Sequence, residues 1–411
     1  MSLIIYFCLQ LYVNYLYKLL RVLLFFMLAF DFEFLTLYTL LFLFCWWLYF
    51  GYLIFIFIHT SLFTEQQKQS LLQEKPFPTI TIIIPTFNEE LIIKDKIENT
   101  IALDYPIDKL RILFCDGGST DNTQKIIHFY TKNTEARKKI DLIHSPDKGK
   151  IPQLNYAISH ASSDIIVISD ADALLSPNAL YVIQENLSQE KIGLIGLSSE
   201  PRNAIKEEAY FWNQQNRLRL AESHFYSPLY VIATCYAFRK DLIQQFPKDV
   251  IADDIYISFY AIKKGYKTRY TPEATVTELR SPTKTTELVK HKIRKTNAFL
   301  HELFRYFTPF LHAKSRWQII FFTRFFQATL GPILSLIFVL IFVYLLFTSL
   351  TKLLPLLTFG ILSLTYLLIR PDALRGFWLK LKMFLLIHVI LYYCLITYLF
   401  YRQTTVYKRI R

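Results

Sequence analysis

The pattern of apolar and polar positions divides the chain into three regions. Residues 34–58 contain no charged side chain and are long enough to form a helix that crosses a bilayer. From about residue 78 to residue 307 the composition becomes that of a soluble domain, and long apolar runs return after it. The pattern therefore predicts a polar domain between an N-terminal and a C-terminal membrane region.

Within the polar region, short runs rich in β-branched residues alternate with helical patterns. The predicted strands are residues 79–84, 110–115 and 164–169. Helices are predicted after residues 119–121 and at Pro177, because both places carry helix-start signals. Strands that alternate with crossover helices predict an open α/β sheet, which binds ligands at the carboxyl ends of its strands.

The outer regions contain apolar segments of several kinds. Residues 3–30 are interrupted by Lys18 and Arg21, so they form either an interfacial helix or a poorly defined span. Residues 317–328 mix apolar and aromatic side chains with Arg324, which predicts an amphipathic helix in the membrane interface. Candidate spans follow at residues 330–349, 353–369 and 384–401.

Charges beside the apolar runs favour the cytosolic face for the polar domain. They do not settle the number of spans, because the loop before the last span and the C-terminal tail are equally basic, so one segment is re-entrant or the count is off by one. No cleavable signal peptide is expected. The predicted domains are residues 1–70 (membrane, one or two spans), 71–307 (cytosolic), 308–328 (interfacial helix) and 329–411 (membrane, about three spans).

Composition agrees with an integral membrane protein. Hydrophobic residues make up 53% of the chain and aromatic residues 17%. The formal net charge is +13, but no basic cluster is interleaved with aromatic residues, so membrane lipids are the expected partner of these cations and nucleic acid is not. The five cysteines lack metal-ligand spacing, which favours free thiols in a reducing compartment.

Carboxylates stand at the ends of the predicted strands. Two carboxylates separated by one small residue at the end of a buried strand cannot both stay charged cheaply without a cation or many hydrogen bonds. Oxygen ligands of this kind suit Mg²⁺ or Mn²⁺, which complete their shells with substrate phosphates and water. These positions therefore predict a metal-dependent site for a phosphate-bearing donor. The acidic positions are Glu89, Asp116, the pair Asp170 and Asp172, and the pair Asp253 and Asp254.

Simpler explanations of these carboxylates stay open. Asp116 begins the sequence Asp-Gly-Gly-Ser-Thr-Asp-Asn, which on its own is a turn before a helix. Asp170-Ala-Asp172 could be a solvated loop. Asp253 and Asp254 precede a helical pattern that ends at Gly265, so they could be capping residues only.

The candidate cations have simpler explanations as well. Lys148 and Lys150 flank a glycine, an arrangement that suits a bound phosphate or simple solvation. Arg294 lies in Lys-His-Lys-Ile-Arg-Lys, residues 290–295, and could belong to a basic patch beside the membrane.

The order of these motifs resembles the family 2 glycosyltransferases of the GT-A fold. The branch in question is membrane-integrated and includes the cellulose, chitin, hyaluronan and poly-N-acetylglucosamine synthases. Residues 82–90, Ile-Ile-Ile-Pro-Thr-Phe-Asn-Glu-Glu, match the opening motif of that family, and residues 149–157 resemble its Gly-Lys-x-x-x-Leu-Asn segment. Asp170-Ala-Asp172 matches its metal-binding motif, and Asp253-Asp254 matches the acidic motif whose last aspartate is the base.

The resemblance implies an open mixed sheet with flanking helices and an inverting sugar transfer. The donor would be a UDP- or GDP-sugar, and the acceptor a lipid-linked molecule or a glycan. Asp172 and Asp170 would hold Mg²⁺ or Mn²⁺ on the diphosphate. Asp254 would remove a proton from the acceptor hydroxyl. The residues implied to contact substrates are Pro85, Thr86, Asn88, Glu89, Asp116, Lys150, Asp170, Asp253 and Arg294.

The chain departs from the processive members of that family at two places. Their Gln-x-x-Arg-Trp motif corresponds here to His291-Lys292-Ile293-Arg294-Lys295, so Lys295 replaces the tryptophan that stacks on the acceptor sugar. Residues 234–239 also lack the glycine usual at the acceptor-side turn. Both departures favour transfer of one or a few sugars. Synthesis of a polyprenyl-phosphate sugar and processive polysaccharide synthesis remain alternatives.

Overall fold

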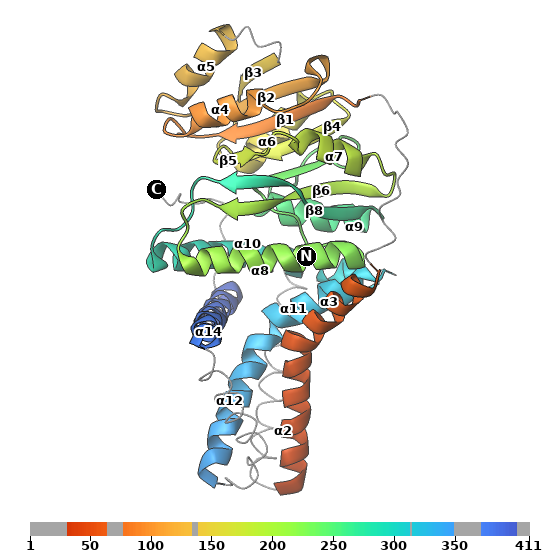
Figure 1. Ribbon diagram of the computed structural model, residues 1–411, viewed down its shortest axis with the longest axis vertical. Coiled ribbons are helices and arrows are strands. Elements are labelled where there is room, and N and C mark those ends of the chain that lie inside the picture. The colour runs from red at the N-terminus through yellow and green to blue at the C-terminus, as the bar shows by residue number, and fades with distance from the viewer. Residues whose placement is uncertain (1–30, 64–76, 134–138, 313–314, 349–370, 401–411) are drawn as a thin grey trace. The chain divides into compact units, whose positions relative to one another are not determined.

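The computed structural model describes residues 31–63, 77–133, 139–312, 315–348 and 371–400 (Figure 1). The chain separates into two compact units. One comprises residues 55–324, and the other comprises the described residues up to Ile54 and from Phe325 onward. The segments 3–30 and 353–369, which the sequence offered as membrane segments, lie outside the described residues. The domain boundaries drawn from the sequence therefore stay predictions.

An eight-stranded mixed sheet forms the centre of the unit of residues 55–324, with the order β3-β2-β1-β4-β7-β6-β8-β5. The first four strands are mutually parallel, β7 is antiparallel to both of its neighbours, and β6 pairs parallel to β8. The predicted open α/β sheet is confirmed. The strands are β1 Ile80–Thr86, β2 Leu110–Asp116, β3 Lys139–His144, β4 Ile165–Ser169, β5 Ala173–Leu175, β6 Ile192–Pro201, β7 Cys235–Arg239 and β8 Lys267–Glu278.

The parallel strands form the core because apolar side chains cover both of their faces. Ile82, Phe114 and Val167, which lie in β1, β2 and β4 respectively, are fully buried in a single cluster. The register pairs Thr86 with Asp116, which brings the ends of β1 and β2 to the same edge of the sheet. The candidate polar side chains are therefore gathered at that edge.

Helices cover the sheet and provide its connections. The helix predicted after residues 119–121 begins at Thr123, and the one predicted after Pro177 begins at Ala179. Gly265 has a φ of 89° directly after the helix that the acidic pair begins, as expected for a stop signal. The helices are α4 Ile93–Ile101, a 3₁₀ turn η3 Ile107–Lys109, α5 Thr123–Asn133, α6 Lys150–Ser159, α7 Ala179–Leu187, α8 Lys206–Phe225, α9 Asp253–Lys263 and α10 Thr285–Leu311.

Two described helical segments are long and apolar enough to cross a membrane. They are Thr36–Ser61, with mean hydropathy 2.2, and Trp378–Tyr398, with mean hydropathy 1.9. The segment predicted at residues 330–349 is helical over Leu330–Thr348, but it meets the same criterion only together with the preceding helix, at a bend of 50°. The elements are α2 Asp31–Trp46, a π-helical turn η1 Trp47–Gly51, α3 Tyr52–Phe63, α11 Trp317–Ala328, α12 Leu330–Thr348 and α14 Pro371–Phe400.

Candidate active site

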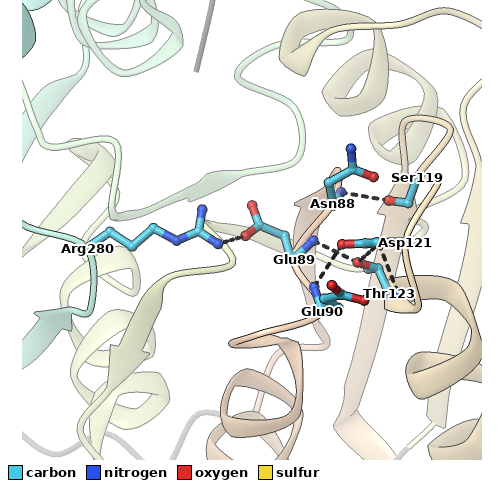
Figure 2. Close-up of polar contacts among 7 residues, drawn as sticks. All are labelled: Asn88, Glu89, Glu90, Ser119, Asp121, Thr123 and Arg280. Atoms are coloured by element: carbon cyan, nitrogen blue, oxygen red, sulfur yellow. Dashed lines mark hydrogen bonds and ion pairs between the residues drawn. The ribbon is translucent and has the colours of Figure 1, made fainter. Parts of the chain in front are cut away.

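The loops that follow β1 and β2 are tied together at the carboxyl edge of the sheet (Figure 2). The amide of Asn88 donates to Ser119 Oγ over 2.9 Å, and the amide of Glu89 donates to Thr123 Oγ1 over 2.7 Å. Asn88 Oδ1 accepts from the amide of Thr120 over 2.8 Å. The φ of Asn88 is 54°, a left-handed conformation that asparagine tolerates better than most residues. Side-chain hydrogen bonds thus fix the backbone around Glu89.

Asp116 organises the loop that follows β2. It is fully buried, and its Oδ2 accepts from the amides of Gly118 and Ser119 over 2.9 Å each and from Gln124 Nε2 over 2.7 Å. Its Oδ1 accepts from Ser119 Oγ over 2.5 Å. The turn that the sequence offered as the simpler explanation is therefore present. Contact of Asp116 with a substrate stays a prediction.

The two glycines after Asp116 are needed for different reasons. A Cβ atom at Gly117 would lie 1.7 Å from Gln153 Nε2, so a side chain there would displace Gln153 of α6. Gly118 has a φ of 87°, which disfavours other residues. The glycine pair lets α6 approach the end of β2 and lets the loop turn back towards the Asp116 carboxylate.

Glu89 forms an ion pair that the sequence did not predict. Its carboxylate is 3% exposed and accepts from Arg280 Nη2, on the segment that follows β8 (Figure 2). The charge of Arg280 also opposes the rise in the pKa of Asp172. Arg280 therefore joins the loop after β1 to the metal-binding candidate, and its only signal in the sequence was its position just beyond a strand.

Asp170 and Asp172 lie in the turn between β4 and β5, and a buried lysine supports this turn. Lys96 of α4 is fully buried, and its Nζ donates to Ser169 Oγ over 2.6 Å and to the carbonyl oxygen of Ala173 over 2.5 Å. These acceptors stand immediately before and after Asp170-Ala-Asp172. Burial lowers the pKa of Lys96 to about 8, and the two aspartates act in the opposite direction. The sequence pattern did not identify Lys96 as a site residue, because a lysine at this position is also typical of the polar face of an amphipathic helix.

The carboxylate oxygens of Asp170 and Asp172 are suitable ligands for a hard divalent cation that binds few protein groups. Burial raises the pKa of the Asp172 carboxyl, and the charge of Asp170 raises it further. Among the described residues, no group of three or more His, Cys, Asp or Glu side chains is placed to hold a metal ion. An ion held by Asp170 and Asp172 would therefore take its remaining ligands from water and substrate phosphates, as Mg²⁺ and Mn²⁺ commonly do.

Lys150 connects the two acidic motifs. Its Nζ lies 2.9 Å from Asp170 Oδ1 and 3.1 Å from Asp253 Oδ2. Burial opposes the charged form of Lys150, but the two carboxylates outweigh burial and hold its pKa above the ordinary value. Lys150 begins α6 directly after Gly149, whose φ is 114°. It is therefore bound between carboxylates rather than simply solvated.

Asp253 and Asp254 begin α9, but they are more than capping residues. Ala252 occupies the N-cap position and makes no side-chain capping bond. Asp253 is 4% exposed and accepts from the buried hydroxyl of Tyr236 over 2.7 Å as well as from Lys150. Burial raises the pKa of Asp254 to about 7, and the charge of Asp253 contributes to the rise. A carboxyl group with a pKa near neutrality is suited to accept a proton.

The segment that corresponds to the synthase motif lies on α10. Arg294 is exposed there, so the basic-patch explanation stays open for it. Lys295 instead lies over the ring of Trp212, 5.0 Å from its centre, and its charge opposes the rise in the pKa of Asp254. His291 is buried, and burial, with the nearby cations, lowers its pKa to about 2. It is therefore neutral and does not add to the positive charge.

Glu278 is a further acidic residue of the site. It ends β8, pairs with Ala173 of β5, and is 8% exposed. Burial raises its pKa to about 7, and the charges of Asp172 and Asp170 also favour the neutral form, while Lys295 opposes it. Sequence reasoning missed Glu278 because β8 mixes polar and apolar residues and lacks the continuous apolar run that precedes Asp116 and Asp170.

Two family profiles match the chain. The profile described as glycosyl transferase family 2 matches residues 81–246, and the profile described as glycosyl transferase family group 2 matches residues 165–401. Both include the acidic turn between β4 and β5. The second covers more than half of the chain.

Two curated relatives agree with these profiles. The chain is 26% identical to "Poly-beta-1,6-N-acetyl-D-glucosamine synthase" of Staphylococcus aureus strain COL, over 52% of this chain and 54% of the relative. It is 24% identical to "Probable glycosyltransferase YdaM" of Bacillus subtilis strain 168, over 49% and 50%. The chain thus spans about half the length of these relatives.

The structural comparison concerns the fold. The mannosyltransferase PcManGT from Pyrobaculum calidifontis, solved in complex with GDP-Man and Mn²⁺, superposes with a TM-score of 0.66 at 21% identity, covering 85% of this chain and 95% of that chain. The GT-A type of open mixed sheet is confirmed by this likeness. With the family profiles, it shows that the chain belongs to glycosyl transferase family 2 and is a glycosyltransferase.

Proposed function

We propose that the protein transfers a sugar from a UDP- or GDP-sugar to a membrane-associated or lipid-linked acceptor, with inversion at the anomeric carbon. The observation that carries this proposal is the bridge of Lys150 between Asp170 and Asp253. Because Lys150 pairs with Asp170 and with Asp253, the bridge supports a donor-binding turn that lies near the candidate base, Asp254. The catalytic domain would face the cytosol, where nucleotide sugars are made.

The donor would bind at the carboxyl edge of the sheet. Pro85, Thr86 and Asn88 end β1 or begin its loop, and with Glu89 and Asp116 they form a rim for the base and ribose. Lys150 would exchange a carboxylate partner for a diphosphate oxygen, because a lysine ammonium binds either anion as a point charge. The predicted contact of Arg294 with the diphosphate remains part of the proposal.

Asp170 and Asp172 would hold Mg²⁺ or Mn²⁺. Such an ion supplies Lewis-acid stabilisation of the leaving diphosphate. The binding of GDP-Man and Mn²⁺ by the structural neighbour supports the choice of a divalent ion. Lys96 would keep the turn in place through its bonds to the residues on either side.

Asp254 would take the proton from the attacking acceptor hydroxyl. A general base works best when its pKa lies near the operating pH, and burial brings the pKa of Asp254 to about 7. Asp253 is occupied by Tyr236 and Lys150, so it would hold the site together while its neighbour reacts.

The test is nucleotide release by purified protein from a panel of UDP- and GDP-sugars. We expect one donor to be consumed in the presence of membrane lipid extract, and Asp254→Asn to abolish the acceptor-dependent part. Asp108→Asn is the matched control, because its side chain is 72% exposed and far from these contacts in sequence. Release of no nucleotide from any donor would contradict the proposal. Acceptor-dependent turnover that survives Asp254→Asn would favour a lipid phosphate acceptor, which is already an anion and needs no base.

Processive polysaccharide synthesis is the second candidate, and the similarity to a poly-N-acetylglucosamine synthase favours it. The aromatic residues that could stack on the acceptor sugar argue for short products. Tyr236 is fully buried, and Trp212 is 3% exposed beneath Lys295, so neither offers a free stacking face. Mass spectrometry of the products should show one or a few added sugars, and Lys295→Trp should lengthen them. A ladder of long polymer from the unaltered protein would establish the processive function.

A further inference from the structure

Arg219 is a buried cation without a counter-charge among the described residues. It lies on α8 and is 6% exposed, and its Nε and Nη1 atoms are buried without a hydrogen-bond partner. The two buried carboxylates of the same helix pair with other cations: Glu208 lies 2.6 Å from Lys292, and Glu222 lies 3.9 Å from Arg324. Buried charges are normally paired, so this arrangement requires a reason.

Aromatic rings surround the guanidinium group but do not satisfy it. The group lies 4.9 Å from the ring centre of Tyr230 and 6.0 Å from that of Trp212. Cation–π contacts stabilise the positive charge. They do not reach the Nε–H and Nη1–H donors, which lie in the guanidinium plane and are able to bind oxygen acceptors.

A second cation of this cluster, Lys295, acts on the candidate base. Lys295 lies 5.0 Å from the centre of the Trp212 ring, and its charge acts on both Asp254 and Glu278. The helices that carry these residues, α8 and α10, lie side by side (Figure 1), as the Lys292–Glu208 ion pair requires. Trp212 thus contacts both Lys295 and Arg219, and the charge of Lys295 reaches Asp254.

We propose that Arg219, Lys295, Trp212 and Tyr230 form an anionic acceptor subsite, which binds a phosphate or carboxylate group of the acceptor. Arg219 provides the unpaired donors, and Lys295 provides a second charge nearer the reacting hydroxyl. The half-buried ring of Tyr230 contacts the apolar part of the same acceptor, and the buried Trp212 holds Lys295 and Arg219 in place. This assignment rests on the proposed function, because it takes Asp254 to mark the place where the acceptor reacts.

The test compares three water-soluble acceptor probes, each of which carries a sugar hydroxyl: a short-chain prenyl phosphate linked to a sugar, a glucuronic acid oligosaccharide and a neutral oligosaccharide. Nucleotide release by the unaltered protein should be stimulated by at least one anionic probe and not by the neutral one. Arg219→Gln should raise the KM for that probe about 10- to 100-fold, as expected for loss of hydrogen bonds to a charged group, with a smaller change in kcat. Arg219→Lys should recover part of the affinity.

Arg217→Gln is the matched control, because Arg217 is exposed on the same helix and lies over Phe57 instead. It should leave the KM for the probe unchanged. Equal stimulation of the unaltered protein by neutral and anionic probes would overturn the proposal, whether or not the Arg219 variants fold. An unchanged KM in folded Arg219→Gln would overturn it as well.

Calorimetry without donor separates this proposal from the proposed function. Binding of the prenyl phosphate or the glucuronic acid oligosaccharide that weakens in Arg219→Gln would support the subsite even if no nucleotide sugar were consumed. Donor consumption without binding of either anionic probe would retain the glycosyltransferase proposal and reject the subsite.

Discussion

Asp253 and Asp254 are neighbours in the sequence but have different surroundings in the structure. Asp253 accepts from Tyr236 and pairs with Lys150, so its charge is compensated. Asp254 is desolvated and feels the charge of Asp253, so its pKa rises to about 7. This difference gives the two carboxylates separate tasks, which their shared position at the start of α9 did not indicate.

The first prediction separates the base from the donor-binding residues. Asp254→Asn should lower the turnover number by about a hundredfold to ten-thousandfold, because a general base contributes on that order. Donor affinity should change little, because Asp254 would face the acceptor. In the unaltered protein kcat/KM should fall as pH drops below about 7, where the Asp254 carboxyl becomes protonated. Steady-state kinetics and donor titration measure both quantities, and parallel loss of donor binding and turnover would show that Asp254 is a donor ligand.

The second prediction concerns Lys96 as a positioning residue. Lys96→Met removes two hydrogen bonds at the turn that holds Asp170 and Asp172, and each net bond to a charged donor contributes about 1.5–3 kcal/mol. We expect Mn²⁺ and donor affinity to fall about tenfold or more while kcat at saturation changes less. Lys94→Met is the matched control, because Lys94 lies on the same helix and its side chain is 65% exposed. Equal loss of affinity in both variants would point to general destabilisation of α4.

At the scale of elements, the turn between β4 and β5 depends on the strands around it. β4 lies between β1 and β7, and β5 pairs with the end of β8. The turn is therefore held on both sides, and Glu278 and Arg280 reach it from the β8 end. Strands that are far apart in sequence meet here, so the complete set of charges around Asp172 depends on the sheet order.

The third prediction concerns this turn. EDTA should abolish sugar transfer, and Mg²⁺ or Mn²⁺ should restore it, because the two carboxylates are expected to act through a divalent ion. Asp172→Asn should raise the ion concentration needed for half-maximal activity. Activity is measured as nucleotide release, and EDTA already saturated with Mg²⁺ is the control. Full activity in free chelator would remove the metal from the proposed reaction.

At the scale of the whole molecule, the candidate site introduces buried carboxyl groups that affect the stability of the fold. The pKa values of Asp254 and Glu278 are both raised to about 7, first of all by burial. A raised carboxyl pKa means that the folded state binds more protons than the unfolded state between about pH 4 and 7. The contribution of these groups to the free energy of unfolding therefore falls as the pH rises through that window.

The fourth prediction follows from this linkage. Asp254→Asn with Glu278→Gln should raise the Tm of the metal-free protein at pH 8, and the gain should shrink towards pH 5, where the native carboxyl groups are protonated. Thermal unfolding in detergent across that range measures the difference, with Asp108→Asn as the exposed control. A gain of the same size at every pH would show that packing, and not ionisation, is responsible.

The sequence by itself determined the elements and the family. Alternation of apolar strands with helical patterns is a local property, and it predicted β1, β2 and β4 and the polar ends that follow them. The run at residues 34–58 predicted a membrane-crossing helix for the same reason, since the length of an uninterrupted apolar stretch is visible in the sequence. The motif order identified the family that the profiles confirm.

Only the tertiary structure decided which charges face one another. Lys96, Glu278 and Arg280 lie far in sequence from the groups they act on, and nothing local marks them as partners. Their burial and their pairing depend on which strands and helices are neighbours, and a buried charge is stable only in relation to those neighbours. The sequence could therefore identify the carboxylates of the site. The folded chain determined how the charge of each carboxylate is compensated. It also determined that, among the described residues, Arg219 has no counter-charge.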